Sequence, residues 1–324
     1  MPRLRARLTG VWRAPITPAT YRTITAVAVV ALMAIVVSGA AVRLTGSGMG
    51  CPTWPTCEDG SLVPRGATGA NGWIEFLNRV FTGFVSIAVA LAVLGARRRV
   101  PYRPELARWA WGLVIGVFAQ ALLGGLVVFL HVTPLAVAGH YLLSAVLLAD
   151  AVILHHKACQ PDGVRTRAVA TPRLQRGARV LAGLAGLVLV TGTLVTGSGP
   201  HSGDDAADRL PFAVVTVARV HSLTVWVFLA AVVFVLRWAT SGDADPSTVG
   251  RGRVLVGAIV AQGALGYAQY AAGVPEAMVA AHVLGSVLVW VATLRFCLAL
   301  VDPLPVEAPT DAPAVVDTVA VAPS

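Results

Sequence analysis

The chain has 324 residues, of which 56% are hydrophobic and only 13% are charged, whereas a soluble domain carries about 25% charged residues. Its mean hydropathy of +0.74 excludes an ordinary soluble protein and indicates an all-α integral membrane protein. The formal net charge of +9 gathers in alternate loops, so we interpret it as a topology signal and predict no nucleic-acid partner.

Eight apolar stretches are long enough for membrane-spanning helices, which need about 20 residues each. Arginine and lysine gather before the first stretch and after the second, fourth and sixth, whereas the alternate loops carry few. The positive-inside rule then predicts that both termini are cytoplasmic. The expected spans are 22–42, 74–95, 107–130, 134–154, 178–196, 212–237, 253–271 and 276–300.

Two halves of four helices are expected, because short motifs recur along the chain. The run from Ala119 to Gly124 returns from Ala261 to Gly266 with the same Ala-Gln start. Four spans bring the chain back to the same side, so a pseudo-twofold axis along the membrane normal would relate two four-helix bundles. The small residues of these runs are expected to permit close helix packing.

The predicted organisation has five parts. Residues 23–155 form the N-terminal half and residues 178–300 the C-terminal half, joined by a cytoplasmic linker at 156–177. Residues 1–22 form a cytoplasmic N-terminal segment before an uncleaved first span. Residues 301–324, rich in proline, alanine, valine and aspartate, are expected to be disordered.

One polar position recurs on the second and fourth helix of each half, and its occupants in chain order are Asn78, His140, His221 and His282. All four lie about 8–14 Å below the outer helix ends, at 1.5 Å per residue. Ionisable groups inside a membrane are costly and usually functional, and paired imidazoles from facing helices hold haem iron. We predict a haem held by His221 and His282. In the first half, Asn78 is a poor iron ligand, which leaves His140.

Three further assignments stay open. His131, at the outer end of the third span, either supplies the missing ligand or is an interfacial polar residue, and the second interpretation is favoured. Glu75 either pairs with Arg79 at the interface or acts as a carboxylate beside the first-half cavity. Arg43 and Arg219 either pair with haem propionates or extend to lipid headgroups.

Four cysteines divide between the two sides of the membrane. Cys51 and Cys57 fall in the first outer loop, while Cys159 and Cys297 lie at the cytoplasmic side. Only the outer pair faces an oxidising compartment. A disulfide between these two is sterically plausible and is favoured over two free thiols.

The run from Val42 to Cys57 reads Val-Arg-Leu-Thr-Gly-Ser-Gly-Met-Gly-Cys-Pro-Thr-Trp-Pro-Thr-Cys, and it is followed by Glu75 and then by Ala-Gly before His140. These motifs resemble the haem A synthase family, in a bacterial, actinobacterial-like form, over about residues 25–300. The resemblance implies a multi-pass enzyme of the bacterial plasma membrane. Its expected reaction oxidises the C8 methyl group of haem O to a formyl group, which gives haem A for cytochrome oxidase.

The resemblance also implies a role for each matched residue. These roles are haem b ligation for His221 and His282, substrate-haem ligation for His140, catalysis for Glu75 and a disulfide for Cys51 and Cys57. The chain departs from the family's Glu-x-x-His pattern, because Asn78 replaces the second substrate-haem histidine. Implied partners are haem O, haem A and membrane lipid. The haem O-forming enzyme, cytochrome oxidase assembly factors and a second copy of the chain stay open.

A rival interpretation is a membrane electron-transfer cytochrome with two b haems and no haem-modifying activity. Both interpretations predict bis-histidine haem at His221 and His282. They differ in the first half, where an electron carrier needs a tightly held iron and an enzyme needs an exchangeable substrate. Asn78 favours the enzyme. A transporter of repeat design leaves the matched histidines unexplained.

Overall fold

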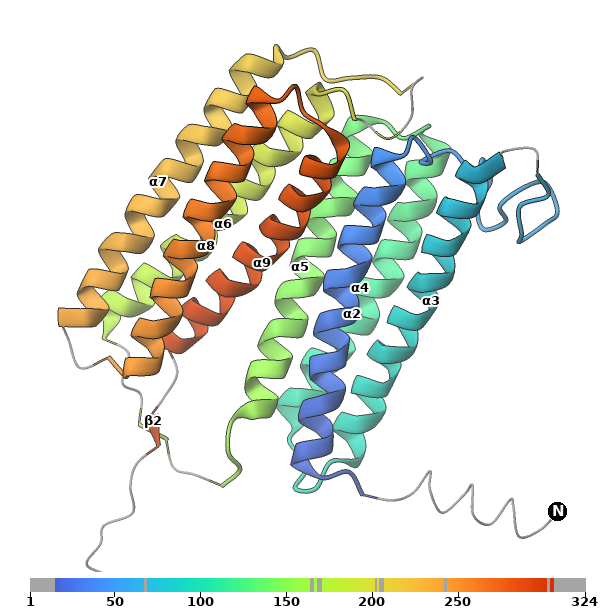
Figure 1. Cartoon of the computed structure of the whole chain (residues 1–324). Helices are drawn as coiled ribbons and strands as arrows, with labels where there is room; N and C mark the ends of the chain where they lie inside the picture. Colours follow the sequence, from blue (N-terminus) through green and yellow to red (C-terminus); the bar gives the residue numbers. More distant parts are fainter. Residues whose placement is uncertain are drawn as a thin grey trace, which may run out of the picture.

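The structure is a computed structural model, and its described part contains eight long helices (Figure 1). Each is long and apolar enough to cross a membrane, so the chain is a multi-pass membrane protein, as predicted. The described residues are 15–66, 69–163, 166–167, 171–201, 203, 207–241, 244–301 and 304–305.

The helices exceed the predicted spans at most ends. Their bounds are α2 (Pro18–Leu44), α3 (Gly69–Arg98), α4 (Pro104–Phe129), α5 (Pro134–Cys159), α6 (Pro172–Ser198), α7 (Val214–Ser241), α8 (Pro246–Ala271) and α9 (Glu276–Val301).

Capping residues explain much of the extra length. The side chains of Thr17, Thr171 and Asp245 accept backbone N–H groups from the first turns of α2, α6 and α8. Proline follows each cap, where its missing N–H costs nothing. The start of α8 at Pro246 lies seven residues before the predicted start at 253, because a cap and not hydrophobicity sets this end.

The helices form two similar rings of four. In the first ring α2 contacts α3 and α5, and α4 contacts the same two helices; α6, α7, α8 and α9 repeat this pattern. The rings meet where α5 lies against α9, flanked by α2 on α9 and α6 on α5, and Figure 1 shows α5 and α9 side by side. A twofold axis between α5 and α9 exchanges all these contacts.

Each ring has its own apolar core. Leu106 and Leu148 are among the fully buried side chains of the first, and Leu181 and Phe296 of the second. Trp290 packs against both cores. The junction between the rings is therefore a continuous packed interface.

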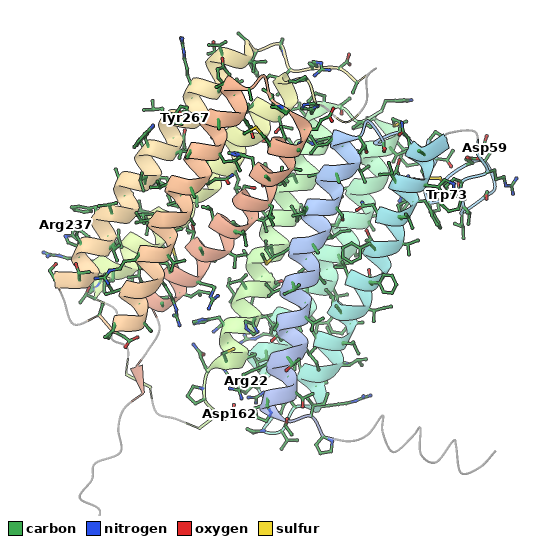
Figure 2. The ribbon with its side chains drawn as sticks, in the orientation of Figure 1. Arg22, Asp59, Trp73, Asp162, Arg237 and Tyr267 are labelled. Carbon is green, nitrogen blue, oxygen red and sulfur yellow. A yellow bond between two sulfur atoms is a disulfide. The ribbon has the colours of Figure 1, made fainter. Side chains whose placement is uncertain are left out.

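The two ends of the bundle differ in their connections. The loop end carries residues 45–66, and Figure 2 shows Asp59 and Trp73 there, with Arg22 and Asp162 at the opposite end. At that opposite end Arg99 is fully buried and donates to both carboxylate oxygens of Asp162, at 2.8 and 2.7 Å. Some of the basic residues interpreted as topology signals thus also tie the connections together.

A two-residue antiparallel pair joins β1 (Thr166–Arg167) to β2 (Leu304–Pro305) at the end opposite the loop end. It links the predicted linker to the predicted tail. The rest of that tail from 306 onward, and residues 1–14 of the predicted N-terminal segment, lie outside the described residues. The five-part organisation stays a prediction.

Candidate functional site: unequal histidine sites in two similar bundles

His282 lies six residues into α9, between a glutamine and a glycine of α8. Gln262 donates its side-chain N–H to the backbone carbonyl of His282 at 2.7 Å. The imidazole covers Gly266, where a Cβ atom would lie only 3.0 Å from Cε1 of the ring. The repeated Gln and Gly therefore hold the helix and make room for the ring.

His221 on α7 has a different support, from α6. Thr191 lies 3.0 Å from Nδ1 of His221, and its hydroxyl also donates to the carbonyls of Leu187 and Val188. Because the single hydroxyl hydrogen is used there, Thr191 accepts the Nδ1–H of His221. This hydrogen bond selects the tautomer whose Nε2 carries a lone pair, which is the form that ligates metals. Gly192 leaves room for this ring, with a Cβ position 3.3 Å from Cε1.

The two imidazoles of the second bundle come from α7 and α9, which both pack against α6 and α8. Nδ1 of His282 is buried without a hydrogen-bond partner, and the rings come from facing helices at similar depths. Two imidazoles from facing helices supply the donor atoms that a bis-histidine haem needs. The residues present therefore fit haem iron.

His140 on α5 repeats the surroundings of His282. Gln120 donates to the backbone carbonyl of His140 at 3.2 Å, and a Cβ on Gly124 would lie 3.4 Å from Cε1 of the ring. Nδ1 of His140 is likewise buried without a partner. Gln120 also contacts the hydroxyl of Ser144. The first and second halves thus build the same frame around their fourth-helix histidine.

The second helix of the first half lacks an imidazole. Ser38 on α2 donates to the amide oxygen of Asn78 at 2.7 Å, in the place that Thr191 and His221 occupy in the other half. His131 does not fill this role in the structure, because it is exposed in the turn after α4 with a left-handed backbone at φ 50°. Among the described residues, His140 is the only imidazole brought to this site.

Glu75 and Arg79 form a partly buried ion pair, with Arg79 Nη2 2.5 Å from a Glu75 oxygen. The second oxygen of Glu75 accepts the backbone N–H of Cys51 at 2.8 Å. Arg79 donates to three loop carbonyls, those of Cys51, Thr53 and Thr56, at 2.9–3.1 Å. Glu75 is only 7% exposed. The predicted pair with Arg79 therefore forms, and the role of Glu75 beside the first-half cavity stays a prediction.

The loop that this pair holds is closed by a disulfide between Cys51 and Cys57, with sulfurs 2.04 Å apart, as predicted. Its Trp54 packs on Gly125, where a Cβ would lie 2.8 Å from the indole. Gly125 adjoins Gly124, which the ring of His140 covers. The disulfide loop therefore packs against α3 and α4 at the loop end of the first bundle.

The open assignments of Arg43 and Arg219 stay predictions, and Arg43 makes a contact that the sequence did not indicate. Arg43 donates to the backbone carbonyl of His201, and His201 Nε2 lies 3.0 Å from the carbonyl of Val274. These bonds connect α2 with the turns of the second half. Arg219 is exposed. The sequence offered no signal for the bridging role of His201.

Some residues that support the histidines stand in recurring sequence motifs, but the motifs did not reveal their role. Gln120 and Gln262 stand in the recurring motif, yet only the structure shows them bonded to the histidine carbonyls. Gly124 and Gly266 were expected to serve helix packing, whereas each lies under a histidine ring. Thr191 stands at the position that Ser38 holds in the first half, which is the signal that could have revealed its bond to His221.

The fold and the site together define a duplicated eight-helix membrane protein with a histidine site in each half, near the loop end. Residues 22–201, more than half of the chain, match the COX15-CtaA family, described as cytochrome oxidase assembly protein. The chain belongs to this family.

Several bacterial relatives carry the name heme A synthase. The protein from Alkalihalophilus pseudofirmus is 30% identical over 158 residues, which are 48% of this chain and 50% of the relative. Those from Lysinibacillus sphaericus and Shouchella clausii are 32% and 34% identical over 128 and 124 residues, about 39% and 38% of this chain and 41% and 40% of the relatives. The match therefore spans half or less of each relative's length.

Proposed function

We propose that the chain is a haem A synthase, which oxidises the C8 methyl group of haem O to a formyl group. Family membership and the names of its relatives support this activity. The observation that carries it is the inequality of the two histidine sites. One half has imidazoles on its second and fourth helices, whereas the other has an imidazole on the fourth helix and an amide and a buried carboxylate on the second.

The second half is the proposed resident haem b site, with His221 and His282 as axial ligands. Thr191 fixes the tautomer of His221, and Gln262 fixes the backbone of His282. Bound haem b would supply an iron that accepts and passes on single electrons. Two strong nitrogen ligands keep such a group in place through many turnovers.

The first half is the proposed substrate site, with His140 on the iron of haem O. Asn78, bonded to Ser38, contributes no second imidazole, so the substrate is held more weakly than haem b. An enzyme that must release haem A needs such an exchangeable site. The disulfide loop packs near this site, with Trp54 on Gly125 next to the glycine that faces His140, and would help to exclude water from it.

The proposed reaction consists of two hydroxylations of the methyl group, which give a geminal diol that loses water. Each hydroxylation inserts one oxygen atom of O₂, consumes two electrons and two protons, and releases one water. Glu75 is the proposed catalytic carboxylate. Glu75 lies one helical turn from Asn78. One of its carboxylate oxygens pairs with Arg79, and the other accepts the N–H of Cys51. From this position it would act on the substrate from the side of the disulfide loop.

We infer that the loop end faces the outside of a bacterial plasma membrane. A disulfide persists in an oxidising compartment, and the loops of this end carry few basic residues. Haem O and haem A are lipid-soluble, so exchange with the haem O-forming enzyme and with cytochrome oxidase assembly factors would occur within the membrane. A second copy of the chain is a further proposed partner.

Co-expression of the chain with a haem O supply tests the activity, followed by chromatography of the extracted haems. We expect haem A in the extract, and none when Glu75→Ala replaces the natural chain. Extracts that contain haem B and haem O but never haem A would contradict the enzyme and favour the di-haem cytochrome.

A further inference from the structure

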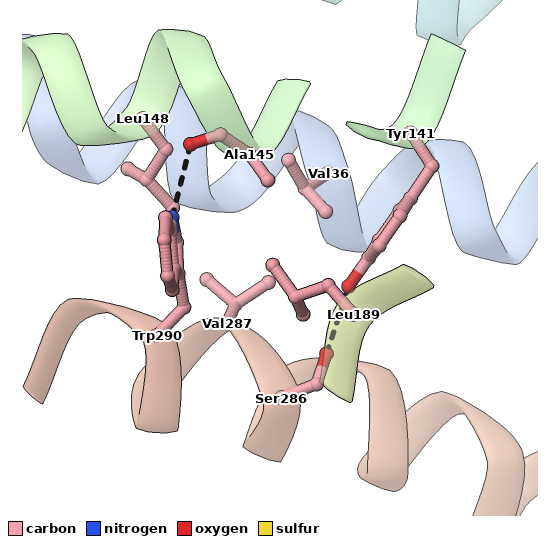
Figure 3. Close-up of a pocket in the computed structure, with 8 residues that line it drawn as sticks. All are labelled: Val36, Tyr141, Ala145, Leu148, Leu189, Ser286, Val287 and Trp290. Carbon is pink, nitrogen blue, oxygen red and sulfur yellow. Dashed lines mark hydrogen bonds between the residues drawn. The ribbon is translucent and has the colours of Figure 1, made fainter. Parts of the chain in front are cut away.

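Among the described residues, two side-chain hydrogen bonds join α5 to α9 at the junction between the halves (Figure 3). The hydroxyl of Tyr141 lies 3.1 Å from the hydroxyl of Ser286. Trp290 donates its indole N–H to the backbone carbonyl of Ala145 at 2.9 Å. Between these bonds lies a cavity of about 10 Å³, roughly the room of one water.

The direction of the Tyr141 bond follows from the other contact of Ser286. Ser286 donates its only hydroxyl hydrogen to the carbonyl of Val283 at 2.7 Å. Its oxygen therefore accepts from Tyr141, whose phenol is the donor. Replacement of Tyr141 by phenylalanine would remove this bond while Ser286 keeps its own.

The Tyr141 bond connects the segments that carry the two fourth-helix histidines. Tyr141 directly follows His140, and Ser286 lies four residues, one helical turn, after His282. A route from one imidazole to the other therefore crosses the junction through a single hydrogen bond.

This bond is not a product of the duplication. The position equivalent to Tyr141 in the second half is Val283, and the position equivalent to Trp290 in the first half is Leu148, each 142 residues away. Both equivalent residues, Val283 and Leu148, are apolar. Burial of a phenol is favourable only when its hydroxyl has a hydrogen-bond partner. The polar pair is thus a specific feature of one side of the junction.

We propose that Tyr141 is a positioning residue that couples the two histidine sites. Its bond to Ser286 fixes α5 on α9 and would provide the route for a single electron between haems held at His282 and His140, with no proton transferred. This inference rests on the haem occupancy of the proposed function, though not on the formation of haem A.

The first test measures electron transfer between the two haems of the purified holoprotein, by photolysis of carbon monoxide from the half-reduced form. Tyr141→Phe should slow the transfer several-fold and leave the low-spin spectrum and haem content unchanged. Ser286→Ala should slow the transfer by the same factor as Tyr141→Phe. The double variant should be no slower than either single variant, because all three lose the same Tyr141–Ser286 bond.

The control is Tyr267→Phe. Tyr267 also bonds a serine hydroxyl, that of Ser222 at 2.5 Å, but this bond stays within the second half. The Tyr267→Phe variant should leave the transfer rate unchanged. Equal rates in the Tyr141→Phe, Ser286→Ala and natural proteins would overturn the inference. A slowed rate in a protein that makes no haem A would support the coupling and refute the proposed enzyme.

A second readout needs no haem. Spin labels at the equivalent exposed positions Val146 and Leu288, 63% and 48% exposed, report the spacing of α5 and α9 once Cys159 and Cys297 are replaced by serine. Tyr141→Phe should broaden the distance distribution, and Tyr267→Phe should not. An unchanged distribution in Tyr141→Phe would refute the positioning role.

Discussion

The two halves have one scaffold and differ in what the second helix brings to it. Both place a histidine on the fourth helix, hold its carbonyl with a glutamine and leave room for its ring with a glycine. On the second helix, His221 of one half corresponds to Asn78 of the other. The hydroxyl that supports this position is Thr191 in one half and Ser38 in the other.

A second difference concerns the loop end. The Glu75–Arg79 pair of the first half corresponds to Ala218 and Ser222 in the second, 143 residues later. Only the first pair holds a disulfide-closed loop. The two halves thus share a common frame, and a few substitutions distinguish the proposed retaining site from the proposed substrate site. Four predictions test this comparison.

The largest expected effect comes from His221→Asn, which copies the first-half residue into the second half. Asparagine can still bond Thr191, but it offers no imidazole nitrogen to iron, so we expect complete loss of the low-spin haem b spectrum. The measurement is the absorption spectrum of the purified protein, with haem content by extraction. His131→Ala is the control, because His131 is exposed in its turn, and it should keep the spectrum. Low-spin haem in His221→Asn would refute the assignment.

The reciprocal change, Asn78→His, should convert the first half into a retaining site. Ser38 stands where Thr191 supports His221, so the new imidazole would find a hydroxyl partner. We expect a second tightly held low-spin haem and a several-fold lower yield of haem A, measured together in one preparation. Unchanged haem content and yield would show that Asn78 does not determine how firmly the substrate is held.

Arg79→Ala should destabilise the first half by about 3 kcal/mol, because it leaves the Glu75 carboxylate buried without its partner and removes donors from three loop carbonyls. Thermal unfolding in detergent and proteolysis of the loop measure this change. Arg65→Ala is a matched control in the same loop, where Arg65 is exposed. An equal loss in both variants would show that the loop does not depend on the ion pair.

Much of this architecture could be predicted from the sequence, because hydrophobic length, charge distribution and internal repeats are properties of the linear chain. The eight spans, the duplication and the four polar positions all follow from them. Most of the helix ends did not, since Asp245 with Pro246, for example, starts α8 well before its apolar run. The loop contacts of Arg79 were also out of reach, because its partners are backbone carbonyls 23 to 28 residues away, and backbone groups leave no trace in a sequence motif.

The roles of the small residues were predicted only in part, for a related reason. Glycine permits both close helix packing and room for a neighbouring side chain, and spacing along one helix does not distinguish these uses. Gly266 lies under His282, whereas Gly263, one turn earlier, has open space around its Cβ position. Only the placement of α9 against α8 separates the two.

The smallest expected effect comes from adding one methyl group under each fourth-helix histidine. In Gly266→Ala the new Cβ would lie 3.0 Å from the His282 ring, and in Gly124→Ala it would lie 3.4 Å from the ring of His140. The first is tight enough to shift the ring, so we expect a cost of about 1 kcal/mol and a weakened low-spin haem b signal. The second is nearly an ordinary contact and should change stability by less than about 1 kcal/mol.

Gly263→Ala, on the same helix as Gly266, is the control for helix propensity alone, and alanine there should stabilise α8 by up to about 1 kcal/mol. Thermal unfolding and the haem b spectrum of the three variants make the comparison. If Gly266→Ala behaved like Gly263→Ala, the ring of His282 would not depend on the space above Gly266. If Gly124→Ala were the more damaging of the two, the tighter histidine frame would belong to the first half, and the proposed division between a retaining and an exchanging site would be reversed.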